Sequence, residues 1–101
     1  MLFRSEEGSL DVVAVSDDGA WAVTTPLLPI TPNGCGDVTA ALYLAHLTTT
    51  GSPARALERT TGSVFALLET TLAAGTREIQ LVAAQEALAD PPATFTARQL
   101  R

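Results

Sequence analysis

Two extended segments separated by a turn sequence open the hydrophobic pattern of the chain. Residues 10–15 are rich in β-branched side chains, residues 16–19 read Ser-Asp-Asp-Gly, and residues 20–25 return to an extended pattern. Apolar runs on either side of such a turn sequence are typical of a β-hairpin. We therefore predict a hairpin over about residues 10–25, with a loop of three to five residues in which Gly19 takes a positive φ.

Two segments follow in which apolar residues recur at helical spacing. The first covers about residues 37–48, and its broad apolar stripe indicates a mostly buried helix. The second covers about residues 53–74, with Ser52 as N-cap, Pro53 at the first helical position and Gly75 just past the end. Six residues are predicted to mark its inward face: Leu57, Thr61, Val64, Phe65, Leu68 and Leu72.

The remaining segments are shorter. Residues 26–32 hold three prolines, which predicts an extended connector rather than a helix or a central strand. Residues 79–82 are apolar and fit either type of element, and residues 83–89 favour a short helix that the next prolines stop. Residues 95–100 alternate as in a short final strand. The pattern predicts an α/β chain: a hairpin, two main helices, and a short terminal helix and strand.

Composition and charge narrow the possible functions. The 101 residues suffice for one small domain, and 47% hydrophobic with 17% charged residues indicates a globular chain. Six arginines, no lysine and eleven acidic residues give a net charge of −5, so we expect neither nucleic-acid binding nor a basic membrane-binding helix. We also expect no membrane-spanning segment. Cys35 is the only cysteine, which excludes an intrachain disulfide and favours a reducing, cytoplasmic setting.

One sequence has catalytic character: Gly34-Cys35-Gly36-Asp37 at the start of a predicted helix. Two glycines allow a ligand to approach the backbone closely. The unpaired N–H groups of the first helical turn, together with the helix dipole, form an anion site suited to phosphate. The carboxylate of Asp37 could accept a proton from an alcohol that attacks a phosphoryl group. An ordinary tight turn with Asp37 as N-cap is the alternative interpretation.

Other candidate residues have ordinary structural explanations. We do not expect Cys35 to act as a nucleophile, because no partner base is near it in the sequence. His46 is interpreted as a helix-surface or packing residue, and Trp21 as a core or interface anchor, with ligand stacking as a less favoured role. The acidic pairs at residues 6–7 and 17–18 are interpreted as a solvated run and a turn.

Residues 33–42, Asn-Gly-Cys-Gly-Asp-Val-Thr-Ala-Ala-Leu, resemble the G-x-G-D signature of ribokinase-like kinases. Residues 78–85, followed by Pro91 and by Phe-Thr-Ala at 95–97, resemble the tail of pyridoxal kinases in particular. The resemblance covers nearly the whole chain from about Leu10. Members of the family are much longer, and this chain resembles their C-terminal third. The resemblance implies that the chain folds as the C-terminal part of a ribokinase-like αβα sandwich. It also implies that residues 1–101 are a fragment of a pyridoxal kinase domain.

The resemblance also implies an activity: ATP-dependent phosphorylation, with Mg²⁺, of the 5′-hydroxyl of pyridoxal, pyridoxine or pyridoxamine. Asp37 matches the catalytic base, which also contacts the vitamin. The N–H groups of Gly34, Cys35 and Gly36 match the anion hole. The family's adenine-binding positions match five residues: Thr25, Pro26, Leu27, Leu28 and, less securely, Leu68. The groups that hold Mg²⁺ and the vitamin ring are expected outside this chain, so it contains no predicted metal ligand.

Two alternatives stay open at this point. The chain could belong to a related kinase for hydroxymethylpyrimidine or for a sugar. It could also be a non-catalytic remnant that binds only nucleotide or a partner, since binding energy that orients the substrates would come mostly from the missing part. In the full-length protein, the resemblance implies a homodimer.

Overall fold

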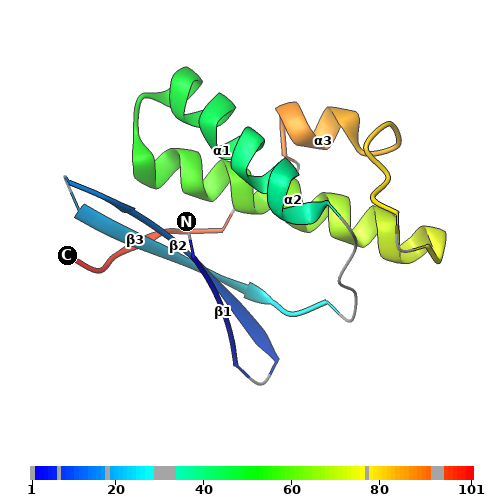
Figure 1. The fold of residues 1–101 in the computed structure, drawn as a ribbon, viewed down its shortest axis with the longest axis horizontal. Helices are drawn as coiled ribbons and strands as arrows, with labels where there is room; N and C mark the ends of the chain where they lie inside the picture. The colour runs from blue at the N-terminus through cyan, green and yellow to red at the C-terminus, as the bar shows by residue number, and fades with distance from the viewer. Residues whose placement is uncertain (1, 7, 18, 29–33, 77, 92–94) are drawn as a thin grey trace.

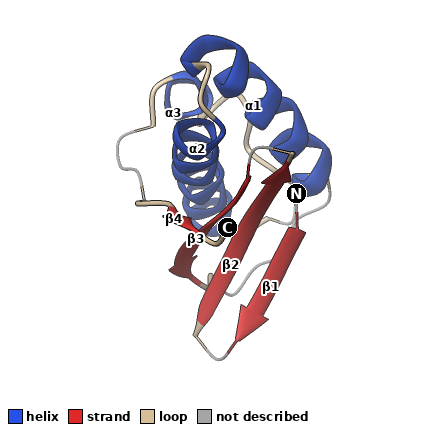
Figure 2. Cartoon of the chain, turned by 90° about the vertical axis from the view of Figure 1, so that its left-hand side faces the viewer, coloured by secondary structure: helices blue, strands red, loops and turns tan. Residues whose placement is uncertain are grey.

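The computed structural model describes residues 2–6, 8–17, 19–28, 34–76, 78–91 and 95–101 (Figure 1). Four strands form one antiparallel sheet in the order β1-β2-β3-β4, and three helices lie on one face of it (Figure 2). The strands are β1 (Leu2–Glu6), β2 (Ser9–Ser16), β3 (Gly19–Pro26) and β4 (Arg98–Gln99). The helices are α1 (Cys35–Thr50), α2 (Pro53–Ala74) and α3 (Gln85–Ala89). This mixed helix and strand structure agrees with the predicted fold class.

The β2–β3 hairpin turns its main apolar side chains toward the helices. Val12 pairs with Val23 and Ala14 pairs with Trp21 in the antiparallel register. Residues opposite one another share a face of the sheet, so these four side chains lie on the same side. Val12, Ala14 and Val23 are buried with Leu57 of α2 in the hydrophobic core.

The turn of this hairpin is shorter than predicted. Ser16 and Gly19 are register partners, so two positions join the strands rather than three to five. Gly19 has the predicted positive φ, 156°. A Cβ at this position would lie 2.7 Å from the carbonyl oxygen of Arg101. The close passage of the C-terminal segment therefore requires glycine here, in addition to the turn.

β1 is not among the predicted elements. The hydrophobic pattern does not reveal it, because residue 6 reads as part of a solvated acidic run. The backbone of Leu2–Glu6 pairs with β2, from Leu2 opposite Val13 to Glu6 opposite Ser9. Position 7 lies outside the described residues. Edge strands tolerate charged residues, and charge there discourages pairing with other chains. Local composition therefore does not predict β1, because this strand forms by pairing with β2.

The two main helices end at glycines in the left-handed conformation, Gly51 with φ 68° and Gly75 with φ 70°. Ser52 caps α2 as predicted, because its hydroxyl accepts a hydrogen bond from the Arg55 backbone N–H at 3.3 Å. The predicted inward face of α2 is wrong at one position. Leu72 is 38% exposed, whereas Leu67 is completely buried. The buried stripe of α2 thus follows Leu57, Val64 and Leu67 rather than continuing to Leu72.

The prediction that the first helix is mostly buried is wrong. Only Thr39 and His46 of α1 are buried and Leu44 is 65% exposed, because α1 packs mainly on α2 with one face.

The C-terminal residues return to the sheet. Residues 81–84 form turns before α3, so the uncertain apolar run is not a strand in the part that the structure describes. β4 is shorter than predicted, but it lies inside the range 95–100. Its residues pair with β3, Gln99 opposite Trp21 and Arg98 opposite Ala22. The chain therefore adds its last strand to the edge of the hairpin.

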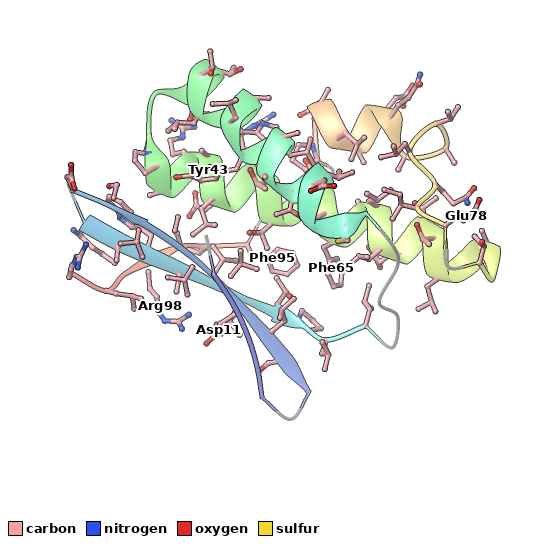
Figure 3. The ribbon with its side chains drawn as sticks, in the orientation of Figure 1. Asp11, Tyr43, Phe65, Glu78, Phe95 and Arg98 are labelled. Atoms are coloured by element: carbon pink, nitrogen blue, oxygen red, sulfur yellow. The ribbon has the colours of Figure 1, made fainter. Side chains whose placement is uncertain are left out.

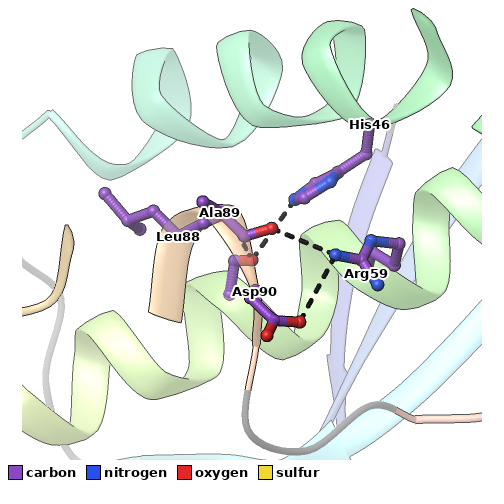
Figure 4. Close-up of polar contacts among 6 residues, drawn as sticks. His46, Arg59, Leu88, Ala89 and Asp90 are labelled. Carbon is purple, nitrogen blue, oxygen red and sulfur yellow. Dashed lines mark hydrogen bonds and ion pairs between the residues drawn. The ribbon is translucent and has the colours of Figure 1, made fainter. Parts of the chain in front are cut away.

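A buried histidine joins the three helices (Figure 4). His46 of α1 is 5% exposed, and its Nε2 lies 3.3 Å from the Ser63 hydroxyl of α2. That hydroxyl donates to the Leu88 carbonyl of α3 at 3.0 Å. Since a hydroxyl has one proton, Nε2–H of His46 must donate to Ser63. Nearby, Arg59 donates to the Ala89 carbonyl at 3.0 Å. The packing interpretation of His46 is confirmed.

This arrangement predicts a loss of stability in mild acid. Burial and the positive charge of Arg59 lower the pKa of His46, while a hydrogen bond with the Leu88 backbone opposes the shift. The unfolded chain, with a histidine pKa of about 6.5, then binds a proton more readily than the folded chain. The free energy of unfolding should therefore fall as the pH decreases below about 6.5 toward the lowered folded-state pKa.

Urea unfolding at several pH values between about 7.5 and 5 measures this effect. His46 is the only histidine of the chain, so His46→Gln removes the titrating side chain and keeps a hydrogen-bond donor. The variant should show a shallower dependence of stability on pH. An equal dependence in the two proteins would contradict the account.

Candidate functional site

The start of α1 has the geometry of an anion site. Gly34 is the N-cap, with φ 82° and ψ 0°, and no side chain caps the helix. A Cβ on Gly36 would meet no atom within 4 Å, so the space beside it is open. The first N–H groups of a helix have no intrahelical partners and lie at the positive end of its dipole. Gly34 occupies the N-cap position, so Asp37 is not the N-cap that the alternative interpretation assumed.

Asp37 lies in the first turn of α1 and is exposed. Within the described part of the chain, no hydrogen bond or ion pair holds its carboxylate. The group is therefore accessible to a ligand at the helix start. An exposed carboxylate beside unpaired N–H groups can accept a proton while an anion is bound next to it.

Cys35 is not activated by its position at the helix start. The thiol is half-buried, and burial raises its pKa, while a side-chain contact with Thr39 lowers it to a smaller extent. The Thr39 hydroxyl lies 4.0 Å from the Sγ atom and donates to the Cys35 carbonyl at 2.7 Å. Since the thiolate is the nucleophile, a raised pKa agrees with the expectation that Cys35 is not catalytic.

A mostly apolar pocket of about 70 Å³ lies between the hairpin and α2. The five residues that the resemblance assigned to the adenine all line it: Thr25, Pro26, Leu27, Leu28 and Leu68. Thus two segments separated by about 40 positions, at the end of β3 and on α2, meet in one cavity. Leu27 is 46% exposed, so the pocket opens to solvent on its side.

Sequence reasoning missed the rest of the pocket wall. The additional lining residues are Leu10, Val12, Thr39, Thr60, Thr61, Val64 and Phe65. The sequence contains one signal that could have found some of them. Positions 60, 64 and 68 are four residues apart, so Thr60 and Val64 share one face of a helix with the predicted pocket residue Leu68. Thr60 is fully buried, and its hydroxyl has no hydrogen-bond partner among the described residues. The wall therefore contains one hydroxyl that no described residue uses.

The pocket and the helix start are neighbours. Thr39 lines the pocket and also bonds to the carbonyl of Cys35, one turn earlier in α1. Asp37 is two positions away from it in the sequence. A molecule with a flat apolar group and an attached anionic group could occupy both places at once, the first in the pocket and the second at the N–H groups.

No family model matches the chain. A curated relative, Pyridoxal kinase PdxY of Rubrobacter xylanophilus, is 53% identical over 95 residues, which cover 94% of this chain and 33% of that protein. The chain is thus similar, over most of its own length, to part of relatives that are named pyridoxal kinase. It spans about a third of the length of the curated relatives that it matches.

Solved structures show the same fold at low sequence identity. Pyridoxal kinase from Leishmania donovani, in complex with ADP and pyridoxamine, superposes with a TM-score of 0.83 at 19% identity, covering 97% of this chain and 37% of that one. A structure described as a phosphomethylpyrimidine kinase, from Bacteroides thetaiotaomicron, gives 0.83 at 22% identity, covering 95% and 35%. At these identities the likeness concerns the fold alone: this chain has the fold of about a third of each of these structures, which agrees with the predicted fold class.

Two searches of the described residues gave negative results. They contain no group of three or more His, Cys, Asp or Glu side chains that could hold a metal ion. Among the described helices, none is both long and apolar enough to cross a membrane.

The environment of Cys35 predicts its reactivity. The pH at which its alkylation rate reaches half of the maximum should lie above that of a small free thiol, because burial raises the pKa of Cys35. Thr39→Val should raise this pH further, since the hydroxyl contact favours the thiolate. Thr48→Val, at an exposed threonine of the same helix, is the matched control. A midpoint below that of the free thiol would show instead that the helix start activates the cysteine.

Proposed function

We propose that this chain forms the nucleotide- and phosphate-handling part of a pyridoxal kinase. The whole enzyme would transfer the γ-phosphoryl group of ATP to the 5′-hydroxyl of pyridoxal, pyridoxine or pyridoxamine. The observation that carries the proposal is the apolar pocket next to an uncapped helix start that bears the exposed Asp37. The identity of 53% to a relative named pyridoxal kinase supports the choice of substrate.

Each part of the site has a role in the proposed reaction. The pocket residues Thr25, Pro26, Leu27, Leu28 and Leu68 hold the adenine. The N–H groups of Gly34, Cys35 and Gly36 stabilise the phosphoryl group in transfer. Asp37 accepts the proton of the 5′-hydroxyl as its oxygen bonds to the γ-phosphorus and the bond to the ADP oxygen breaks.

Other parts of the enzyme must complete the site. Mg²⁺ would neutralise charge on the phosphates, and its ligands would come from the two thirds of the relatives' length that this chain does not span. The residues around the vitamin ring would come from the same part. A homodimer and a cytoplasmic location stay predictions.

The related-kinase alternative is weaker for a specific reason. The fold likeness does not separate pyridoxal kinases from phosphomethylpyrimidine kinases, because both superpose equally well at low identity. The curated relatives at 53% and 51% identity are both named pyridoxal kinase. A substrate panel separates these kinases directly, because only a pyridoxal kinase should prefer the B6 vitamers.

A chimeric enzyme tests the proposal. This chain replaces the matching 95-residue segment of the Rubrobacter xylanophilus relative, which supplies the remaining length. Asp37→Asn in the chimera should lower kcat for pyridoxal by about 10²- to 10⁴-fold, because it removes the base. The KM for ATP should change little, since the pocket is intact. Asp17→Asn, in the exposed hairpin turn, is the matched control and should leave both constants unchanged.

The other outcomes of this assay are equally clear. Near-normal turnover by Asp37→Asn would disprove its role as base. A preference of the chimera for hydroxymethylpyrimidine or a sugar would favour the related kinases. An inactive but folded chimera beside an active parent would identify the chain as a non-catalytic remnant.

A further inference from the structure

The last residues of the chain are anchored on two sides by specific contacts. On the sheet side, β4 pairs with β3, and Arg98 forms an ion pair with Asp11 at 3.5 Å and donates to the Thr24 hydroxyl at 2.7 Å. On the helix side, the carboxylate of Glu58 accepts a hydrogen bond from the backbone N–H of Ala97 at 2.6 Å. Residues 95–99, called the tail below, therefore bridge the edge of the sheet and α2 (Figure 3).

These anchors place an aromatic ring behind the pocket. Phe95 contacts Phe65 edge to face, with ring centroids 5.2 Å apart and planes at 76° (Figure 3). Phe65 lines the pocket, whereas Phe95 does not. Phe95 and Ala97 also pack against the hydrophobic core of Val12, Ala14, Val23 and Leu57. The tail thus contacts a pocket residue without lining the pocket itself.

The geometry along α2 explains why both anchors are needed. Glu58 and Phe65 are seven positions apart, so they lie on the same face of the helix two turns from each other. The tail follows this face, with Ala97 at Glu58 and Phe95 at Phe65. An edge-to-face contact restricts the orientation of both rings. Release of the tail at Glu58 would therefore loosen the support of Phe65 without touching the pocket.

We propose that Phe95 is a positioning residue for the nucleotide, which acts by holding Phe65 in the pocket wall and is itself held by Glu58. This inference rests on the proposed function, in which the pocket binds the adenine. It assigns the tail a part in nucleotide affinity in addition to stability. The effect of Glu58 on the pocket passes through Phe95.

Titration of the 101-residue chain with ADP, followed by calorimetry, tests the proposal together with urea unfolding of each variant. Phe95→Leu, which keeps an apolar side chain but loses the ring contact, should weaken ADP binding roughly two- to tenfold. Phe95→Tyr, which keeps the ring, should bind ADP as the unchanged chain does. Leu100→Ala is the matched control, because Leu100 follows the tail and is 52% exposed.

A double-mutant cycle identifies the route of the effect. Glu58→Ala should weaken ADP binding in the unchanged chain, but it should have no further effect in the Phe95→Leu background, since the ring that it holds in place is absent. Unfolding in urea shows that each variant is folded in the titration. Equal, independent losses from the two substitutions would overturn the route through Phe95.

The remaining outcomes separate this inference from the proposed function. If the unchanged chain binds ADP and folded Phe95→Leu binds it equally well, the tail contributes only stability and the positioning role is wrong. A loss in Phe95→Tyr as large as in Phe95→Leu would also overturn it. If the unchanged chain binds no ADP, the nucleotide pocket of the proposed function fails, and this inference fails with it.

Discussion

Burial of the middle of α2 is the constraint on which the rest of the structure depends. Nine residues of this helix are buried, because it packs on the sheet and also against α1 and α3. Leu57 joins the core of the hairpin, while Ser63 bonds to His46 of α1 and to the Leu88 carbonyl of α3. The same helix carries Val64 and Leu68 in the pocket wall. The pocket is therefore held in shape by the contacts that stabilise the fold.

Much of this arrangement could be predicted, and the failures have physical causes. The span of α2 was readable because Ser52, Pro53 and Gly75 are local signals. β1 was missed because an edge strand depends on its partner, and Leu72 was misplaced because helical spacing does not reveal where neighbouring elements end. The pocket residues at the end of β3 and Leu68 could be predicted from the resemblance to pyridoxal kinases. Its other walls, such as Thr39 and Phe65, require tertiary contacts that no local pattern contains.

The proposed site combines two features that this chain contains. The pocket proposed for the adenine and the helix start proposed for the phosphate are next to each other, because Thr39 lines the pocket and donates a hydrogen bond to the Cys35 carbonyl. Both are built from residues of this chain. The raised pKa of Cys35 keeps its thiol out of the proposed reaction.

The central claim is that the pocket and the start of α1 form a single nucleotide site. NMR spectra of the isotopically labelled chain during titration with ATP, which carries the γ-phosphoryl group, test this most directly. The account predicts that the backbone amides of Cys35, Gly36 and Asp37 and the methyl groups of Val64 and Leu68 shift together, with one common dissociation constant. Shifts at only one of the two places, or at neither, would contradict it.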